Sequence, residues 1–152
     1  MKGQGENTLT CGSYMEVKTY TFPPHGDDRG QLVAIEAMEH IPFAVKRIYY
    51  IYDTLPDVRR GFHAHRNLQQ VLICVSGSCK IHLDNGTETA EVLLDNPNTG
   101  LYISNDMWRE MYDFTPGAVL LVLASEHYDE ADYIRDYDTF INMVRGRKDS
   151  TV

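Results

Sequence analysis

The sequence predicts an all-β fold, an antiparallel β-sandwich or barrel, followed by one α-helix. Short apolar stretches recur along the chain, and turn residues separate them about every 8 to 12 positions, as in sandwiches and barrels. Asp84-Asn85-Gly86 lies between two alternating stretches and predicts a tight hairpin turn, which favours antiparallel pairing. After Asp129 the apolar residues take the spacing of a helix.

The bulk properties narrow the class of protein. The 152 residues correspond to about one domain. A formal net charge of −8 argues against nucleic-acid binding, because phosphate neutralisation needs a basic surface. No apolar stretch approaches the roughly 20 residues of a membrane span and no signal peptide is visible, so we expect no membrane association and a cytoplasmic protein. Cys74 and Cys79 are expected to be buried, reduced thiols.

The chain divides into three parts by composition. Residues 1–15 are polar and glycine-rich and are expected to form a flexible leader; a single domain spans 16–144, and a polar tail spans 145–152. Within the domain, strands are predicted where β-branched and aromatic residues cluster or alternate with polar ones. In chain order these strands are 17–22 (an edge strand), 31–36, 43–52, 63–65 continuing into 71–75, 79–83, 87–94, 101–104, 108–114 and 118–124.

Between the predicted strands lie segments rich in Gly, Pro, Asn and Asp. They predict loops or turns at 23–30, 53–61, 76–78 and 95–100. The last element is a helix that begins near Asp129, where acidic residues suit a helix N-terminus. Its predicted apolar face packs on the strands and consists of Ile134, Tyr137, Ile141 and Val144.

His63 and His65 are the most informative pair of polar residues. They stand two apart on a predicted strand, so their side chains point to the same face of the sheet. Imidazole has an unperturbed pKa close to neutral pH, and the pair therefore suits either metal ligation or proton transfer.

The same pair, followed by the turn glycine Gly77, resembles the first conserved motif of the cupin superfamily, which implies a cupin-type jelly-roll barrel. In metal-binding cupins this motif supplies two histidines and a carboxylate, and a later hairpin supplies a third histidine. Here the carboxylate position falls on Gln69 or Gln70, and the later position falls on Arg109. A guanidinium repels a divalent cation, so we expect neither a metal nor another cofactor. Arg109 is instead suited to stabilise an oxyanion or enolate.

Further motifs match a narrower group. They are Gly61–His65, Gly100–Tyr102, Trp108–Met111, Val122–Ser125 and Tyr128–Glu130. Together, over about residues 16–140, they resemble the sugar 3,4-ketoisomerases that act on thymidine-diphosphate 4-keto-6-deoxyglucose. The resemblance implies a thymidine-diphosphate-linked keto-sugar as substrate and a role in deoxyaminosugar biosynthesis for lipopolysaccharide or S-layer glycans. It also implies a homodimer that exchanges N-terminal strands, which would cover an exposed sheet edge.

The chemistry of such an isomerase fits the residues at hand. Moving a ketone from C4 to C3 of a hexose needs a base at C3, a group that stabilises the enediolate and an acid at C4. By similarity to the family, His63 is the general base and His65 moves the proton. Tyr49, on a neighbouring predicted strand, is expected to form hydrogen bonds in the cavity, and Arg109 is expected to stabilise the oxyanion.

Substrate binding is expected to use arginines. The family grips the diphosphate with arginine just before the histidines, where this chain has Arg59 and Arg60. Guanidinium forks match phosphate oxygens. Arg47 shares a strand face with Tyr49 and is a further candidate, as is Gln69.

Two questions stay open at the level of sequence. Arg109 favours a product with the gluco configuration at C4, whereas Arg29, also a candidate for substrate binding, is associated with galacto-type members of the family. A 3- or 3,5-epimerase on the same fold would also remove a proton beside the ketone. A non-catalytic sugar-binding cupin is the remaining alternative.

Overall fold

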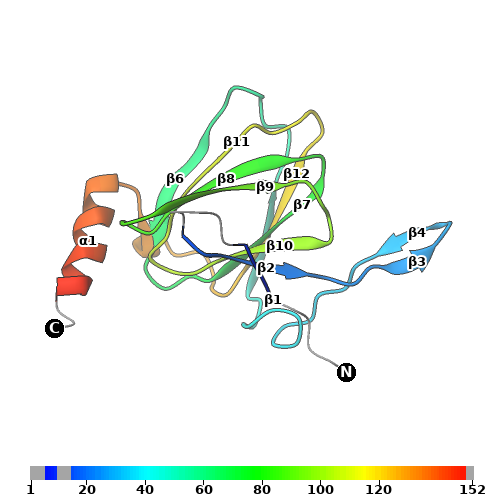
Figure 1. The fold of residues 1–152 in the computed structure, drawn as a ribbon, viewed down its shortest axis with the longest axis horizontal. Coiled ribbons are helices and arrows are strands. Elements are labelled where there is room, and N and C mark those ends of the chain that lie inside the picture. The colour runs from blue at the N-terminus through cyan, green and yellow to red at the C-terminus, as the bar shows by residue number, and fades with distance from the viewer. Residues whose placement is uncertain (1–5, 10–14, 150–152) are drawn as a thin grey trace.

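The structure is a computed structural model, and it describes residues 6–9 and 15–149 (Figure 1). Two antiparallel sheets form a barrel. In order across the larger sheet, the strands are β1 (Glu6–Leu9), β2 (Val17–Thr21), β10 (Thr99–Ile103), β7 (Gln70–Ser76), β12 (Val119–Ala124) and β5 (Arg47–Ile51). In the second sheet they are β13 (Tyr133–Ile134), β6 (Arg60–His65), β11 (Trp108–Tyr112), β8 (Cys79–Asp84) and β9 (Thr89–Leu94). The prediction of an antiparallel all-β fold with a C-terminal helix is confirmed.

The core lies between the sheets because each strand alternates inward and outward side chains. Inward residues of both sheets form one buried cluster, which includes Leu72, Cys74, Ile81, Leu83, Leu101, Met111, Leu120 and Val122. The residues between them on β7, Val71 and Ile73, point the other way and pack in a second cluster with Phe22, Ile41 and Phe43. The segment 33–45 thus covers the outer face of the larger sheet instead of forming the predicted strand 31–36.

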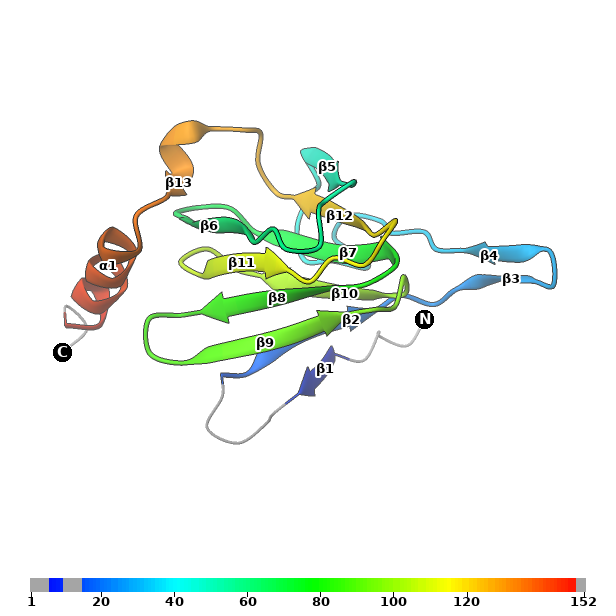
Figure 2. The same ribbon diagram turned by 90° about the horizontal axis from the view of Figure 1, so that it is seen from above.

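The N-terminal part of the chain differs from the prediction in two places. Residues Glu6–Leu9 belong to the expected leader, but they pair antiparallel with β2 as strand β1, so β2 is not the edge strand. The other leader residues 1–5 and 10–14 lie outside the described residues. Within the predicted loop 23–30, β3 (His25–Asp27) pairs with β4 (Gly30–Leu32) as a hairpin. Figures 1 and 2 show this hairpin extending away from the sheets, on the side opposite the C-terminal helix.

The C-terminal helix begins later than predicted. A 3-10 turn, η1 (Glu130–Asp132), and strand β13 come first, because residues 133 and 134 pair with β6. Helix α1 then runs over Tyr137–Asp149, through the first part of the expected tail; residues 150–152 lie outside the described residues. Its Tyr137 and Phe140 rings pack on Trp108, at centroid distances of 5.3 and 5.9 Å. No helix among the described residues is long and apolar enough to cross a membrane.

Candidate active site

A β-bulge in β6 orients the two histidines. Gly61 and Phe62 have positive φ angles of 93° and 55°, and the register between β6 and β11 shifts at this point. A Cβ atom on Gly61 would lie 2.8 Å from the backbone oxygen of Arg109, which requires glycine here. Beyond the bulge, His63 and His65 are both buried, and their ring centroids lie 4.8 Å apart at an interplanar angle of 87°.

A hydrogen-bonded chain runs beside the histidines from β11 through β7 to β5. Arg109 is fully buried; its Nη1 donates to Oε1 of Gln70, and its Nη2 donates to the backbone oxygen of Met107 at 2.9 Å. Because a guanidinium can only donate, it fixes the amide oxygen of Gln70 toward itself. The Gln70 Nε2 atom then donates to the Tyr49 hydroxyl at 3.0 Å, which leaves the hydroxyl proton of Tyr49 available to another acceptor.

Burial shifts the ionisation of this group toward neutral histidines. It lowers the pKa of His63 to about 4, and the cation of Arg109 contributes to the same shift. Burial and Arg109 also lower the pKa of His65, whose Nδ1 lies 2.9 Å from Oδ2 of Asp132. The pKa of Arg109 itself falls to about 10 through burial, so the guanidinium stays charged at neutral pH. The site therefore combines two unprotonated imidazoles with one fixed cation.

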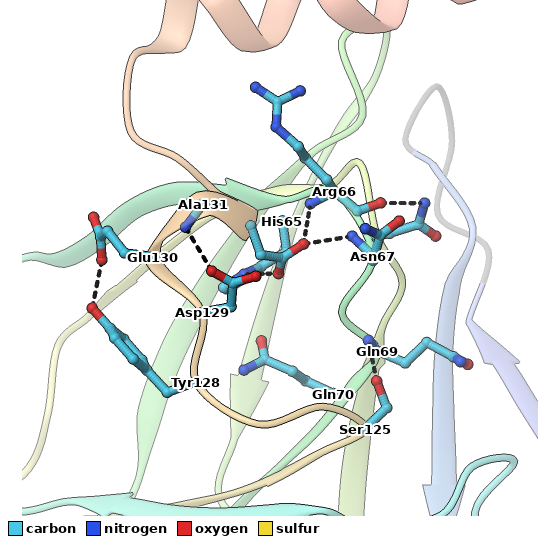
Figure 3. Close-up of polar contacts among 12 residues, drawn as sticks. His65, Arg66, Asn67, Gln69, Gln70, Ser125, Tyr128, Asp129, Glu130 and Ala131 are labelled. Carbon is cyan, nitrogen blue, oxygen red and sulfur yellow. Dashed lines mark hydrogen bonds and ion pairs between the residues drawn. The ribbon is translucent and has the colours of Figure 1, made fainter.

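Strand β13 adds two groups to the histidines. It pairs with β6 so that Tyr133 lies opposite His65, with 4.4 Å between their ring centroids. The preceding residue, Asp132, accepts a hydrogen bond from Nδ1 of His65 at 2.9 Å. The backbone nitrogens of Arg66 and Asn67, which lie beside His65 in Figure 3, also donate to the Asp132 carboxylate.

A cleft of about 520 Å³ opens beside His63. Its lining comes from β5, β6, β11 and the segment 128–135: Arg47, Tyr49, Tyr50, Ile51, Arg60, Gly61, His63, Met111, Tyr128, Tyr133 and Arg135. Three of these residues are arginines, so the cleft is locally cationic in a chain whose net charge is −8. A second hollow of about 600 Å³ shares Tyr128 with the cleft, but His63 does not line it. The cleft beside His63 is therefore the candidate active site.

The mouth of the cleft is held by charged and aromatic contacts. Arg135 donates to both carboxylate oxygens of Glu130, at 2.8 and 3.0 Å, and its guanidinium lies 4.3 Å from the centre of the Tyr133 ring. The Tyr128 hydroxyl donates to the same carboxylate. The guanidinium of Arg47 lies 5.6 Å from the centre of the Tyr128 ring. These contacts tie the segment 128–135 to the wall that β5 provides.

The structure brings together the four residues predicted to be catalytic and separates those predicted to bind substrate. Arg47 and Arg60 line the cleft. Arg59 does not, since its Nε donates to Glu110 at 2.7 Å and its guanidinium stacks on Tyr112. The carbonyl oxygen of the Gln69 side chain accepts from the Tyr102 hydroxyl at 2.7 Å.

Gln70, and not Gln69, is hydrogen-bonded to Arg109 and Tyr49. Neighbouring residues of a strand point to opposite faces. Figure 3 shows the two side chains pointing in opposite directions, with Gln70 toward His65. Arg29 lies near the tip of the β3–β4 hairpin, with its side chain 88% exposed and paired with Asp27, away from the cleft of its own chain.

Sequence reasoning missed Asp132, Tyr133 and Arg135. Their positions depend on the pairing of β13 with β6, two segments that are far apart in the chain. The nearby motif Tyr128–Glu130 pointed to this region without showing which neighbours reach the histidines.

The side chains around His63 and His65 do not suit a divalent cation. His63 and His65 could act as ligands, but the next two positions are the neutral amide of Gln70 and the buried guanidinium of Arg109. The fixed positive charge of Arg109 beside the imidazoles repels a divalent metal cation. Among the described residues, three side chains of metal-ligating type come within 4.8 Å of one another only at Glu36, Glu39 and His40, which lie in the 33–45 segment outside the cleft lining.

A jelly-roll-like barrel with paired inward histidines and a cationic cleft defines a cupin-type protein. The family follows from comparison: the chain belongs to the FdtA family (WxcM-like, C-terminal), whose model matches residues 15–145.

Three relatives show how close the similarity is. The TDP-4-oxo-6-deoxy-α-D-glucose-3,4-oxoisomerase of Aneurinibacillus thermoaerophilus is 52% identical over 130 residues, covering 86% of this chain and 94% of that protein. A 3,4-ketoisomerase from Helicobacter canadensis is 53% identical, with a TM-score of 0.83 over 87% of this chain and 99% of that one. A variant of the 3,4-ketoisomerase QdtA from Thermoanaerobacterium thermosaccharolyticum, in complex with TDP-4-keto-6-deoxyglucose, is 49% identical, with a TM-score of 0.84 over 86% and 95% of the two chains.

Proposed function

We propose that the protein is a 3,4-ketoisomerase that converts TDP-4-keto-6-deoxyglucose to a TDP-3-keto-6-deoxyhexose. The family and the names of its relatives support this reaction. The single structural observation that favours it most is the pair of neutral histidines next to buried, charged Arg109. An unprotonated imidazole can accept a carbon-bound proton, and a fixed cation stabilises the negative charge that the proton leaves behind.

Each proposed role follows from the position of a side chain. His63 lines the cleft and takes the proton from C3, which gives an enediolate. Arg109 and the available hydroxyl proton of Tyr49 stabilise its oxygens. The deeper His65 moves the hydroxyl proton from O3 to O4, and delivery of the carbon proton to C4 completes the ketone at C3. The proton count balances without any metal or redox cofactor.

The diphosphate is assigned to the cationic part of the cleft. Arg47 and Arg60 are proposed to bind its oxygens, and Arg135 joins them as a residue that the sequence did not indicate. Arg47 and Arg60 can each donate two parallel hydrogen bonds to a phosphate, whereas Nε and Nη2 of Arg135 already donate to Glu130 and leave Nη1 for this contact. Arg59 is left out because it does not line the cleft, and its Nε donates to Glu110.

A homodimer with exchanged N-terminal segments is proposed as the working form. All residues of β3 and β4 are exposed, including the apolar Leu32 at 59%, so this hairpin packs poorly on its own chain. In an exchanged dimer the hairpin would cover a partner subunit and could bring Arg29 to that subunit's cleft. This arrangement would reconcile the expected role of Arg29 with its distance from the site.

A biosynthetic role in the cytoplasm completes the proposal. A ketone at C3 is the group that an aminotransferase needs to make a 3-amino-deoxysugar, as found in surface glycans. Cys74 and Cys79 are buried free thiols, which is in keeping with a reducing compartment.

The test is to follow the carbonyl carbon. Incubation with TDP-4-keto-6-deoxyglucose and 13C NMR of the sugar should show the ketone signal move from C4 to C3. An epimerase would keep the ketone at C4 and change the configuration at C3 or C5, and a binding protein would leave the sugar unchanged. Either of these results would contradict the proposal.

A further inference from the structure

The carboxylate of Asp132 is bound at both of its oxygens. Oδ2 accepts from Nδ1 of His65 at 2.9 Å. Oδ1 accepts from the backbone nitrogens of Asn67 at 2.7 Å and Arg66 at 3.1 Å. The backbone also fixes the position of the aspartate, since the Arg66 N–H donates to the Asp132 carbonyl oxygen at 3.0 Å. A carboxylate oxygen accepts hydrogen bonds, and both oxygens of this side chain face nitrogen atoms.

This contact determines which nitrogen of His65 carries the proton. An ionised carboxylate can only accept, so the neutral imidazole must hold its hydrogen on Nδ1. Its Nε2 atom then keeps a lone pair. Among the residues that the structure describes, Nε2 of His65 is buried and has no hydrogen-bond partner. The ring centroids of His63 and His65 lie 4.8 Å apart, so the lone pair on Nε2 is available for proton transfer next to His63.

A proton on Nε2 would create an imidazolium near the buried guanidinium of Arg109. Two cations repel each other strongly away from water. Within the described part of the chain, Asp132 is the one negative side chain hydrogen-bonded to His65. It offsets this repulsion as the charge develops.

We propose that Asp132 is a positioning residue for the isomerisation: it fixes the Nδ1–H form of His65 and stabilises the imidazolium that forms when Nε2 accepts a proton. The proposal deepens the function proposed above and rests on it. Asp132 acts on the substrate through His65 and does not touch it.

The exchange Asp132→Asn tests this role with little change in shape. The amide oxygen of Asn can still accept from Asn67 and Arg66, but its NH₂ group faces the ring and forces the hydrogen of His65 onto Nε2. We expect kcat to fall about 10²- to 10⁴-fold, as the same exchange beneath the histidine of a serine protease does. KM should change less than threefold, because the cleft arginines are untouched.

The readout that separates positioning from mere folding is 15N NMR of the imidazole nitrogens. In the wild-type protein we expect His65 as the Nδ1–H form, and in Asp132→Asn as the Nε2–H form. This measurement needs no substrate, so it stands even if the keto-sugar is not converted, in which case the proposed function fails separately. A wild-type spectrum with the hydrogen on Nε2 would overturn the inference, whether or not the variant folds.

Asp129→Asn is the matched control. Asp129 lies three residues earlier, and its Oδ1 caps η1 by accepting from the Ala131 nitrogen at 3.0 Å. We expect this variant to keep its kcat and the His65 tautomer. A full kcat in Asp132→Asn, or equal losses of kcat in both variants with an unchanged tautomer, would contradict the role of Asp132.

Discussion

Arg109 and Gln70 are hydrogen-bonded to each other inside the barrel, and neither side chain is accessible to solvent beyond 1%. Gln70 occupies one of the two positions at which metal-binding relatives of this fold would carry a carboxylate. An amide suits this chain because it accepts from Arg109 on one side and donates to Tyr49 on the other. The same bond helps to keep Arg109 buried while charged: Nη1 and Nη2 each have an acceptor, whereas Nε has no hydrogen-bond partner among the described residues.

Gln70→Glu should impair the reaction although it changes few atoms. A carboxylate accepts from Arg109 and partly neutralises it, and it also accepts from Tyr49, whose proton is then no longer available to the sugar. We expect kcat to fall about 10²-fold, as for the loss of one oxyanion donor. Steady-state kinetics would measure it. Gln69→Glu, one residue away on the other strand face, is the control and should stay within about threefold of wild type; a larger loss there would return Gln69 to the site.

Burial of His63 predicts an acid-sensitive fold. Its pKa is about 4 in the folded protein and about 6.5 when unfolded, so the folded state binds fewer protons between these values. Stability is thus complete above about pH 6.5 and falls as the pH drops toward 4, by about 3 kcal/mol for this residue. Urea unfolding at pH 7 and pH 5 would measure the slope. His63→Asn should have a shallower slope, and an unchanged slope would show that His63 is not the group responsible.

Replacement of Arg60 and replacement of Arg59 should have different effects on substrate binding. Arg60 lines the cleft, whereas Arg59 is held by Glu110 outside it. We expect Arg60→Ala to raise KM for the sugar nucleotide about tenfold and to weaken the dependence of KM on salt, because a charged contact to phosphate is lost. Arg59→Ala should leave KM nearly unchanged. The reverse order would mean that Arg59 changes partner on binding.

Subunit mixing tests whether Arg29 acts on a partner. Arg29→Ala and His63→Asn should each be nearly inactive as pure dimers. If the hairpin crosses to the partner, mixed dimers contain one complete cleft, and about a quarter of wild-type activity should return after joint refolding at equal amounts. Arg29 acting within its own chain would give no recovery. Sedimentation of the wild-type protein as a monomer alone would also rule out the exchange.

The parts of the structure that the sequence predicts correctly are those specified by short, local sequence patterns. The alternating stretches around Asp84-Asn85-Gly86 specify strands β8 and β9, and the spacing of His63 and His65 alone places both on one face. The spacing of the cupin-like motif predicts either Gln69 or Gln70 at the carboxylate position, and only the strand register, which sends neighbouring side chains to opposite faces, decides between them.

The remaining parts depend on contacts between distant segments. Residues 130–134 read as the start of a helix, but pairing of Tyr133 and Ile134 with β6 overrides that preference. This pairing brings Asp132 to His65, and no local sequence pattern predicts the contact. Turn residues such as Gly26 and Gly30 predict a loop at 23–30, although part of this segment pairs as the β3–β4 hairpin.

The central claim is that two neutral histidines beside a fixed cation move a proton from C3 to C4 without a metal. The most direct measurement is NMR of the product formed in D₂O after treatment with a chelator, with His63→Asn in parallel. We expect the wild-type protein to give a 3-keto sugar with deuterium at C4, at a rate that chelation leaves unchanged, and the variant to give none. Loss of activity on chelation, or an equally active His63→Asn, would contradict the claim.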